Sequence, residues 1–199
     1  SGTDGHGQRY VFSANHGGPV EAGMGLSVGT NAIQVFEHGD GYMPAVAVYE
    51  ANLGKGWHHV AIVYEKTTAT SNKPRALIYV DGVLVKTGVA SLRDTVKGPT
   101  IMGSGATYQH PEGFVGAVDE VRIWDVARTA SQIAENYYKE ISSPTSQTNL
   151  VGYWQFNNNL ADSSSRNAAT TGSAINYING VITAGTQTAG NAAAHRKNG

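Results

Sequence analysis

The sequence predicts an all-β fold, an antiparallel β-sandwich with one short helix. The composition contains 25 glycines and 10 tyrosines, whereas only 15% of the residues are charged, which is typical of strands joined by turns. Short apolar or alternating segments follow one another along most of the chain. At 199 residues the chain is long enough for one substantial core, because all-β sandwiches often reach this length as a single domain.

The predicted strands are separated by short turns, as in antiparallel sandwiches. They comprise residues 9–14, 25–29, 32–37, 45–49, 58–65, 76–80, 83–87, 100–102, 115–124 and 150–156. Asp81 and Gly82 lie between two apolar segments and indicate a two-residue hairpin turn, since the turns that match strand twist need positive φ here. Both faces of the 76–80 strand are apolar, so we expect this strand to be central in its sheet.

The strand at residues 114–124 has an alternating pattern. Val121 and Ile123 fall on one face, together with the apolar residues at the same spacing before them. Glu120 and Arg122 fall on the opposite face. We therefore expect one continuous strand with a core face and a polar face.

A short helix is expected directly after this strand. Thr129 and Gln132 have the spacing of a capping box, which marks a helix start. Ile133, Tyr137 and Ile141 recur at four-residue spacing and would form one packing face. The helix is thus expected to lie against the sandwich as a lid or edge cover.

Several segments resemble a known family. VDEVRIWDVAR at residues 118–128 is similar to a signature near the end of laminin-G-like, concanavalin-A-like sandwiches, the group that includes pentraxins. WHHVAIVYE at 57–65, ALIYVDGVLV at 76–85 and LVGYWQFNNNLADSSSRNA at 150–168 resemble further family motifs, in the expected order. The resemblance implies a jelly-roll sandwich. It is less specific for function, because this sandwich carries lectins, adhesion modules, polysaccharide-binding modules and enzymes.

Both ends of the chain depart from the family pattern. The segment that usually opens such domains comes last here, at residues 152–156. This strand either closes the domain beside its N-terminal strand or begins a second repeat. We favour the first, because an orphan strand with exposed aromatic side chains would promote aggregation. We expect a sandwich over residues 1–184 and a flexible tail or linker over 185–199, which are rich in Gly, Ala, Thr and Asn.

Charge and cysteine content exclude several function classes. The net charge of -1 and the lack of a basic stripe give no electrostatic basis for binding nucleic acid or an anionic membrane. The chain contains no cysteine, so thiol chemistry and disulfides are absent. No segment approaches the ~18 apolar residues of a membrane span. Ser1 and Gly2 resemble a cleavage scar, so we expect a fragment of a larger extracellular or cell-surface protein, of bacterial origin.

Catalytic residues are not indicated by the sequence. Related sandwiches include glycanases that carry two Glu residues on one strand face, separated by an Asp, and that spacing is absent. Asp119 and Glu120 are adjacent, so their side chains point to opposite faces and cannot flank one glycosidic bond. The neighbours His58 and His59 likewise cannot chelate one metal ion together and are expected to be structural. We therefore expect no enzymatic activity.

Calcium, structural or ligand-assisting, is the cofactor that the resemblance implies. Asp119 has apolar alternation partners, and a buried carboxylate needs a metal, a charge or several donors. Hydrogen bonds from Arg122 or Arg128 are the alternative to a metal there. Asp162 and Asn167 lie in a turn resembling calcium-binding turns, unless it is an Asx-type turn satisfied by its own backbone. The acidic run of pentraxins is absent, which argues against a two-calcium site.

Two polar, glycine-rich loops indicate carbohydrate binding, unless they are ordinary solvated loops. A sugar ring has an apolar face that stacks on an aromatic side chain and a polar rim that accepts hydrogen bonds. The candidate ligand-binding residues are His38, Asp40 and Tyr42 in the first loop and Tyr108, Gln109, His110 and Glu112 in the second. Trp57, Trp124 and Trp154 lie in strand motifs and are expected in the core.

Together these features predict a non-catalytic, lectin-like module that binds a glycan or polysaccharide. One alternative is a protein-binding adhesion or spacer domain, with a cell-surface protein as partner. A second alternative is a glycoside-active enzyme. A carboxylate pair about 5–9 Å apart in a groove would favour the enzyme, and a flat apolar patch would favour protein contact.

Overall fold

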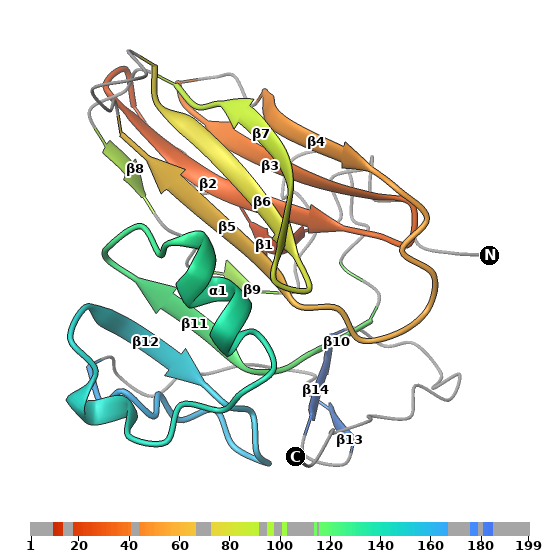
Figure 1. Cartoon of the computed structure of the whole chain (residues 1–199), viewed down its shortest axis with the longest axis vertical. Helices are drawn as coiled ribbons and strands as arrows, with labels where there is room; N and C mark the ends of the chain where they lie inside the picture. Colours follow the sequence, from red (N-terminus) through yellow and green to blue (C-terminus); the bar gives the residue numbers. More distant parts are fainter. Residues whose placement is uncertain are drawn as a thin grey trace. The chain divides into compact units, whose positions relative to one another are not determined.

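The structure is a computed structural model, and it describes residues 10–13, 18–40, 44–66, 73–91, 95–97, 101–102, 114, 116–166, 176–178 and 181–184. These residues form mostly antiparallel sheets and one short α-helix (Figure 1). The chain divides into two compact units, Ser1–Phe114 and Val115–Gly199.

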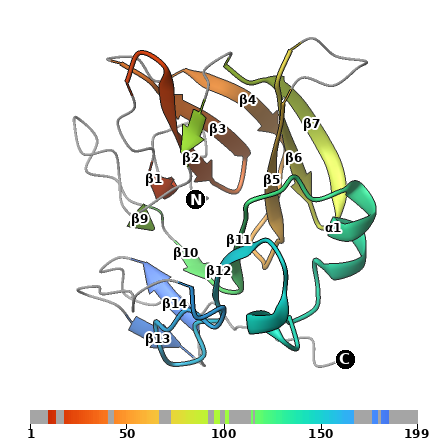
Figure 2. The same cartoon turned by 90° about the vertical axis from the view of Figure 1, so that its left-hand side faces the viewer.

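The described residues of the first unit form two β-sheets. Its strands are β1 (Tyr10–Ser13), β2 (Glu21–Val28), β3 (Ala32–His38), β4 (Ala45–Glu50), β5 (Val60–Glu65), β6 (Arg75–Val80), β7 (Val83–Val89), β8 (Thr95–Lys97) and β9 (Ile101–Met102). The larger sheet has the order β4-β3-β2-β1-β9, and β8 pairs with β2 in parallel. The smaller sheet has the order β5-β6-β7. Figure 2 shows the two sheets as separate layers, which is the sandwich that the sequence predicts.

The two layers enclose a hydrophobic core. Its buried side chains are Leu26, Ile33, Val35 and Ala47 from the larger sheet, Ala76, Ile78 and Val80 from β6, and Ala90. Ile33 and Val35 lie two positions apart, so they share the face of β3 that points inward. Each large aliphatic side chain buried in this way contributes about 1.5–3 kcal/mol.

β6 is the central strand of its sheet, as predicted, because it pairs with β5 on one edge and β7 on the other. Leu77 and Tyr79, on the face opposite Ile78, are also buried, at 3% and 4% exposed. The turn into β7 is formed by Asp81 and Gly82, with φ values of 49° and 83°. Both φ values are positive, as the predicted hairpin turn requires.

The edge strands of the two sheets approach closely at Gly88 on β7. A Cβ atom placed on Gly88 would lie 2.1 Å from the Val46 carbonyl oxygen and 2.7 Å from the Ala47 Cβ. Both neighbours belong to β4, so the absent side chain lets the two layers meet here. Glycine is required at this position for packing.

The second unit contains short strands and the helix. Its elements are β10 (Gly116–Val118), β11 (Val121–Trp124), α1 (Ala130–Asn136), the 3₁₀ turn η1 (Pro144–Ser146), β12 (Leu150–Trp154), β13 (Asn176–Ile178) and β14 (Val181–Ala184). One sheet has the order β10-β14-β13, and β11 pairs with β12 in an antiparallel ribbon.

The expected continuous strand over residues 115–124 is wrong. The strand is interrupted between β10 and β11, and each half pairs with a different partner. Glu120 adopts a left-handed conformation with φ of 55°, which a β-strand cannot continue through. Its side chain is held in a polar network that the alternation pattern does not reveal.

The helix prediction is confirmed at its start and is too long at its end. Thr129 is the N-cap, its hydroxyl accepts from the Gln132 N–H at 3.2 Å, and the Gln132 side chain accepts from the Thr129 N–H at 3.0 Å. Ile133 is buried, whereas Tyr137 is the C-cap and Ile141 lies beyond the helix. One buried residue therefore replaces the expected three-residue face.

Most strand predictions agree with the structure to within a few residues, but three short strands were not predicted, namely β8, β13 and β14. The 150–156 segment forms β12, and Tyr153 and Phe156 are buried at 0% and 1% exposed. It is therefore not an orphan strand. The single domain over residues 1–184 stays a prediction, and the tail at 185–199 lies outside the described residues.

Candidate functional site

The predicted sugar-binding loops are only partly described. His38 ends β3, where it faces Gly23 of β2 in the strand register. Asp40 follows two residues later and is exposed. The remaining predicted residues, Tyr42, Tyr108, Gln109, His110 and Glu112, lie outside the described residues, so the site they were expected to form stays a prediction.

A better defined polar cluster lies where the β4–β5 loop meets the β6–β7 turn. His58 Nδ1 lies 2.8 Å from Asp81 Oδ2, and His58 Nε2 lies 2.7 Å from the Leu53 carbonyl oxygen. The His59 backbone N–H donates to Asp81 Oδ1 at 2.9 Å, and the Asp81 N–H donates to the His59 carbonyl at 2.9 Å. We call this cluster of Leu53, His58, His59 and Asp81 the His58 clasp.

The protonation state of His58 follows from this geometry. Both ring nitrogens face an acceptor, and only the imidazolium can donate from both. The hydrogen bond to Asp81 is the main cause that raises the pKa of His58 above its ordinary value, while partial burial opposes it. The bond to Leu53 adds to the rise. The expected structural role of His58 agrees with these contacts.

The β4–β5 loop is anchored at several points besides the His58 clasp. The Ala51 N–H donates to the Asn31 carbonyl at 3.1 Å, and the Leu53 N–H donates to the Thr30 carbonyl at 2.8 Å. The Gly54 N–H donates to Asn52 Oδ1 at 3.1 Å, which closes an Asx-type turn. The loop is thus fixed to the β2–β3 turn and to the β6–β7 turn.

Trp57 is on the surface of this loop, and its predicted place in the core is wrong. The residue is 39% exposed, which is unusual for a large aromatic side chain. The strand begins only at Val60, so Trp57 belongs to the loop before it and not to the sheet. Trp124 and Trp154 are partly buried, and the Arg128 guanidinium lies 4.2 Å from the centroid of the Trp124 ring.

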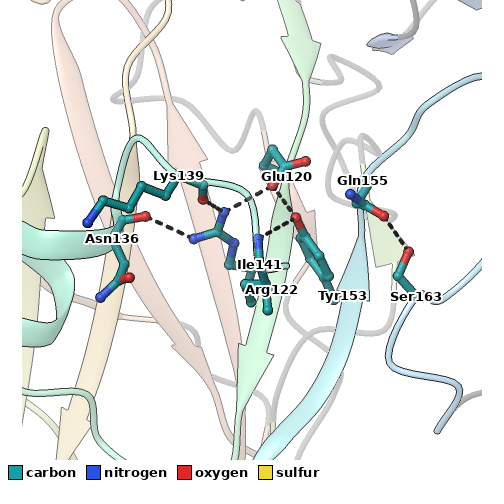
Figure 3. A network of polar contacts seen from close by, with 8 residues as sticks. All are labelled: Glu120, Arg122, Asn136, Lys139, Ile141, Tyr153, Gln155 and Ser163. Carbon is teal, nitrogen blue, oxygen red and sulfur yellow. Dashed lines mark hydrogen bonds and ion pairs between the residues drawn. The ribbon is translucent and has the colours of Figure 1, made fainter. Parts of the chain in front are cut away.

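A second polar network holds the interrupted strand of the second unit (Figure 3). Glu120 Oε2 accepts from Arg122 at 3.0 Å and from the Tyr153 hydroxyl at 2.5 Å. The same hydroxyl accepts from the Ile141 N–H at 3.2 Å. Burial, followed by the bond to Glu120, raises the pKa of Tyr153 to about 12. Tyr153 is therefore protonated at neutral pH and donates to the carboxylate.

Arg122 connects this network to the end of α1. Its guanidinium donates to the Asn136 carbonyl at 3.1 Å and to the Lys139 carbonyl, and it lies 5.4 Å from the Tyr153 ring centroid. Carbonyls at a helix C-terminus lack intrahelical partners and attract cations. The network therefore orders the helix end. Farther along the chain, the Ser163 hydroxyl donates to the Gln155 side chain at 2.8 Å.

Asp162, a predicted calcium ligand, is 8% exposed and forms an Asx-type turn. Its carboxylate accepts from the backbone N–H groups of Tyr153, Ser164 and Arg166 at 2.8, 2.9 and 3.1 Å. The Ser164 hydroxyl contacts both of its oxygens, at 2.7 and 2.8 Å. These donors match the alternative in which the backbone satisfies the turn.

The other predicted metal ligands give no cluster. Asp119 is partly buried between β10 and β11, and Asn167 lies outside the described residues. Within the part of the chain that the structure describes, no group of three or more His, Cys, Asp or Glu residues could hold a metal ion. Calcium binding stays a prediction.

Sequence reasoning missed a buried carboxylate in the first unit. Glu37 on β3 is 0% exposed, and its two oxygens accept from the Ser91 N–H at 3.1 and 3.0 Å. Burial, followed by the charge of Glu37, raises the pKa of Tyr64 above its ordinary range. The strand alternation contained the signal, since Glu37 shares the inward face with Ile33 and Val35.

Comparison with known proteins supports the fold assignment. A laminin-G family model, described as the concanavalin A-like lectin/glucanases superfamily, matches residues 1–134. This range includes the 57–65, 76–85 and 118–128 motifs, whereas the 150–168 motif lies beyond it. No curated protein and no solved structure matches the chain significantly. Among the described residues, no helix has the length and apolar character needed to span a membrane.

The family match covers more than half of the chain and agrees with the two-layered β-sheet arrangement. The protein therefore belongs to the concanavalin A-like lectin/glucanase superfamily.

Proposed function

We propose that this chain is a non-catalytic carbohydrate-binding module of a larger extracellular protein. The observation that carries the proposal is membership of a superfamily whose description names lectins and glucanases. Lectins bind carbohydrates and glucanases hydrolyse them, so a glycan or polysaccharide is the ligand class that the family supports. Domains of the laminin-G type are typically extracellular.

Three of the described carboxylates have structural contacts, which supports a non-catalytic role for these residues. Asp162 accepts backbone N–H groups, and Glu37 accepts the Ser91 N–H. Glu120 binds an arginine and a tyrosine. Each is thus engaged in holding the chain together, whereas glycoside hydrolysis needs a pair of carboxyl groups free to act on the sugar.

The first test is a glycan and polysaccharide array with the full chain in millimolar calcium, repeated with a chelator. We expect selective binding to a small group of glycans. Binding that the chelator abolishes would establish calcium as a ligand-assisting ion. Binding that survives would assign recognition to the side chains alone, and absence of binding to every glycan would overturn the proposal.

Protein-binding adhesion is a second candidate, because one strand exposes apolar side chains. Val83, Leu84 and Val89 on β7 are 63%, 45% and 61% exposed. Exposed apolar side chains on an edge strand are one feature of protein contact sites. Replacing Val83 and Leu84 with Ser would leave glycan binding unchanged and would weaken adhesion to a protein partner.

A further inference from the structure

We propose that Trp57 is the platform on which a sugar ring stacks, with the His58 clasp holding it in position. This inference rests on the proposed function and names a site for it. It differs from the loops that the sequence indicates, because Trp57 precedes β5 in the loop after β4.

The indole of Trp57 is exposed to solvent. Trp57 is 39% exposed, and burying such a large apolar surface is strongly favourable. A protein with a core as well packed as this one, where Ile33 and Ile78 are 0% exposed, leaves a tryptophan outside at a cost. The C–H face of a pyranose can cover the indole without burying a polar group.

The loop that carries Trp57 is fixed by hydrogen bonds. Trp57 directly precedes His58, whose ring is held at both nitrogens, by Asp81 and by the Leu53 carbonyl. The same loop is tied to the β2–β3 turn through the Leu53 N–H. An aromatic side chain on a preorganised loop loses little conformational entropy on binding.

Polar groups are exposed on the same loop and on the β6–β7 turn that the His58 clasp joins to it. The Asp81 side chain is 44% exposed and uses one lone pair on each oxygen, for His58 and for the His59 N–H. A carboxylate has about four acceptor positions, so acceptors remain for sugar hydroxyls. Asn52 is also exposed on this loop. An exposed indole together with hydrogen-bonding groups on the same loop and turn favours a sugar over a wholly apolar ligand.

The test compares Trp57 variants of the full chain on the glycan that gives the strongest array signal. Trp57→Ala should weaken binding about tenfold or more, and Trp57→Phe should retain part of the affinity. Tyr138→Ala is the matched control, because Tyr138 is 64% exposed in the second unit and should leave affinity unchanged. Tryptophan fluorescence should shift on glycan binding in the unmodified protein and not in Trp57→Phe.

The role of the His58 clasp is tested by measuring glycan affinity as a function of pH. The glutamine side chain of His58→Gln cannot carry a charge. Below the His58 pKa, this variant should therefore bind the glycan more weakly than the unmodified protein does. Its glycan affinity should not change as pH rises through the His58 pKa. In the unmodified protein the affinity should fall over that range, because neutral imidazole cannot donate to both Asp81 and Leu53. Asp81 is the charged group that raises the His58 pKa.

The outcomes separate this inference from the proposed function. If the unmodified protein binds a glycan and Trp57→Ala binds it equally well, the platform is wrong and the carbohydrate-binding function stands. If the unmodified protein binds no glycan, both fail. If Trp57→Ala does not fold, Trp57→Phe decides: unchanged affinity with no loss of the fluorescence shift would overturn the platform.

Discussion

His58 has an acceptor at each ring nitrogen, and this makes the stability of the first unit depend on pH. The folded-state pKa of His58 is raised above its ordinary value of 6.5, mainly by Asp81. A group with a raised folded pKa stabilises the fold fully below its unfolded pKa, and this contribution is lost as pH rises through the folded pKa.

We expect His58→Gln to destabilise the protein at about pH 5.5 by up to about 1 kcal/mol, since partly exposed ion pairs contribute little. The difference should shrink as pH rises above the folded pKa. Urea unfolding of both proteins across this range measures it. A destabilisation that is constant with pH would show that His58 acts by packing alone.

Replacing Tyr153 tests how much its polar network stabilises the second unit. Tyr153→Phe removes the donor to Glu120 and the acceptor of the Ile141 N–H, and a buried group left unsatisfied costs about 1–3 kcal/mol. Tyr138→Phe is the control, because that residue is 64% exposed and its hydroxyl reaches water. Chemical denaturation measures both changes, and equal effects would contradict the structural role of the network.

Among the secondary-structure elements, a hairpin turn and a helix start were predictable from the sequence. The turn at Asp81 and Gly82 and the capping box at Thr129 depend on residues within a few positions, and both are present. The break at Glu120 was not predictable, because its left-handed backbone is held by Tyr153, a residue 33 positions away. The exposure of Trp57 also depends on where the strand begins, which tertiary contacts decide.

Contacts between distant residues also limit what the sequence predicts about the candidate site. The sequence indicated polar loops by composition, but the described part of the chain places only His38 and Asp40 of that set. The His58 clasp joins residues 23 positions apart through a hairpin register, which no local pattern reveals. The Asx-type turn at Asp162, which the sequence offered as the alternative to a calcium site, is present because it depends on residues close in the chain, and calcium binding there stays a prediction.

Replacing Gly88 with Ala tests how closely β4 and β7 pack. Gly88→Ala places a Cβ 2.1 Å from the Val46 carbonyl oxygen, so β4 and β7 must separate. We expect a loss of about 1–3 kcal/mol or more, because overpacking a rigid contact strains the backbone. Gly18→Ala is the control, since a Cβ there meets nothing within 4 Å. Thermal unfolding distinguishes them, and similar midpoints would show that the layers adjust freely.

At the scale of the whole molecule, the small net charge predicts that ligand binding depends little on salt. The chain has 14 Lys and Arg residues against 15 Asp and Glu residues, a net charge of -1, so its long-range field is weak. Recognition by an indole and hydroxyl hydrogen bonds acts at short range, where salt screens little. We expect glycan affinity to change less than about twofold between about 50 and 500 mM NaCl. A steep decline with salt, measured by titration calorimetry, would mean that the ligand is charged and that recognition depends on ion pairs instead of stacking.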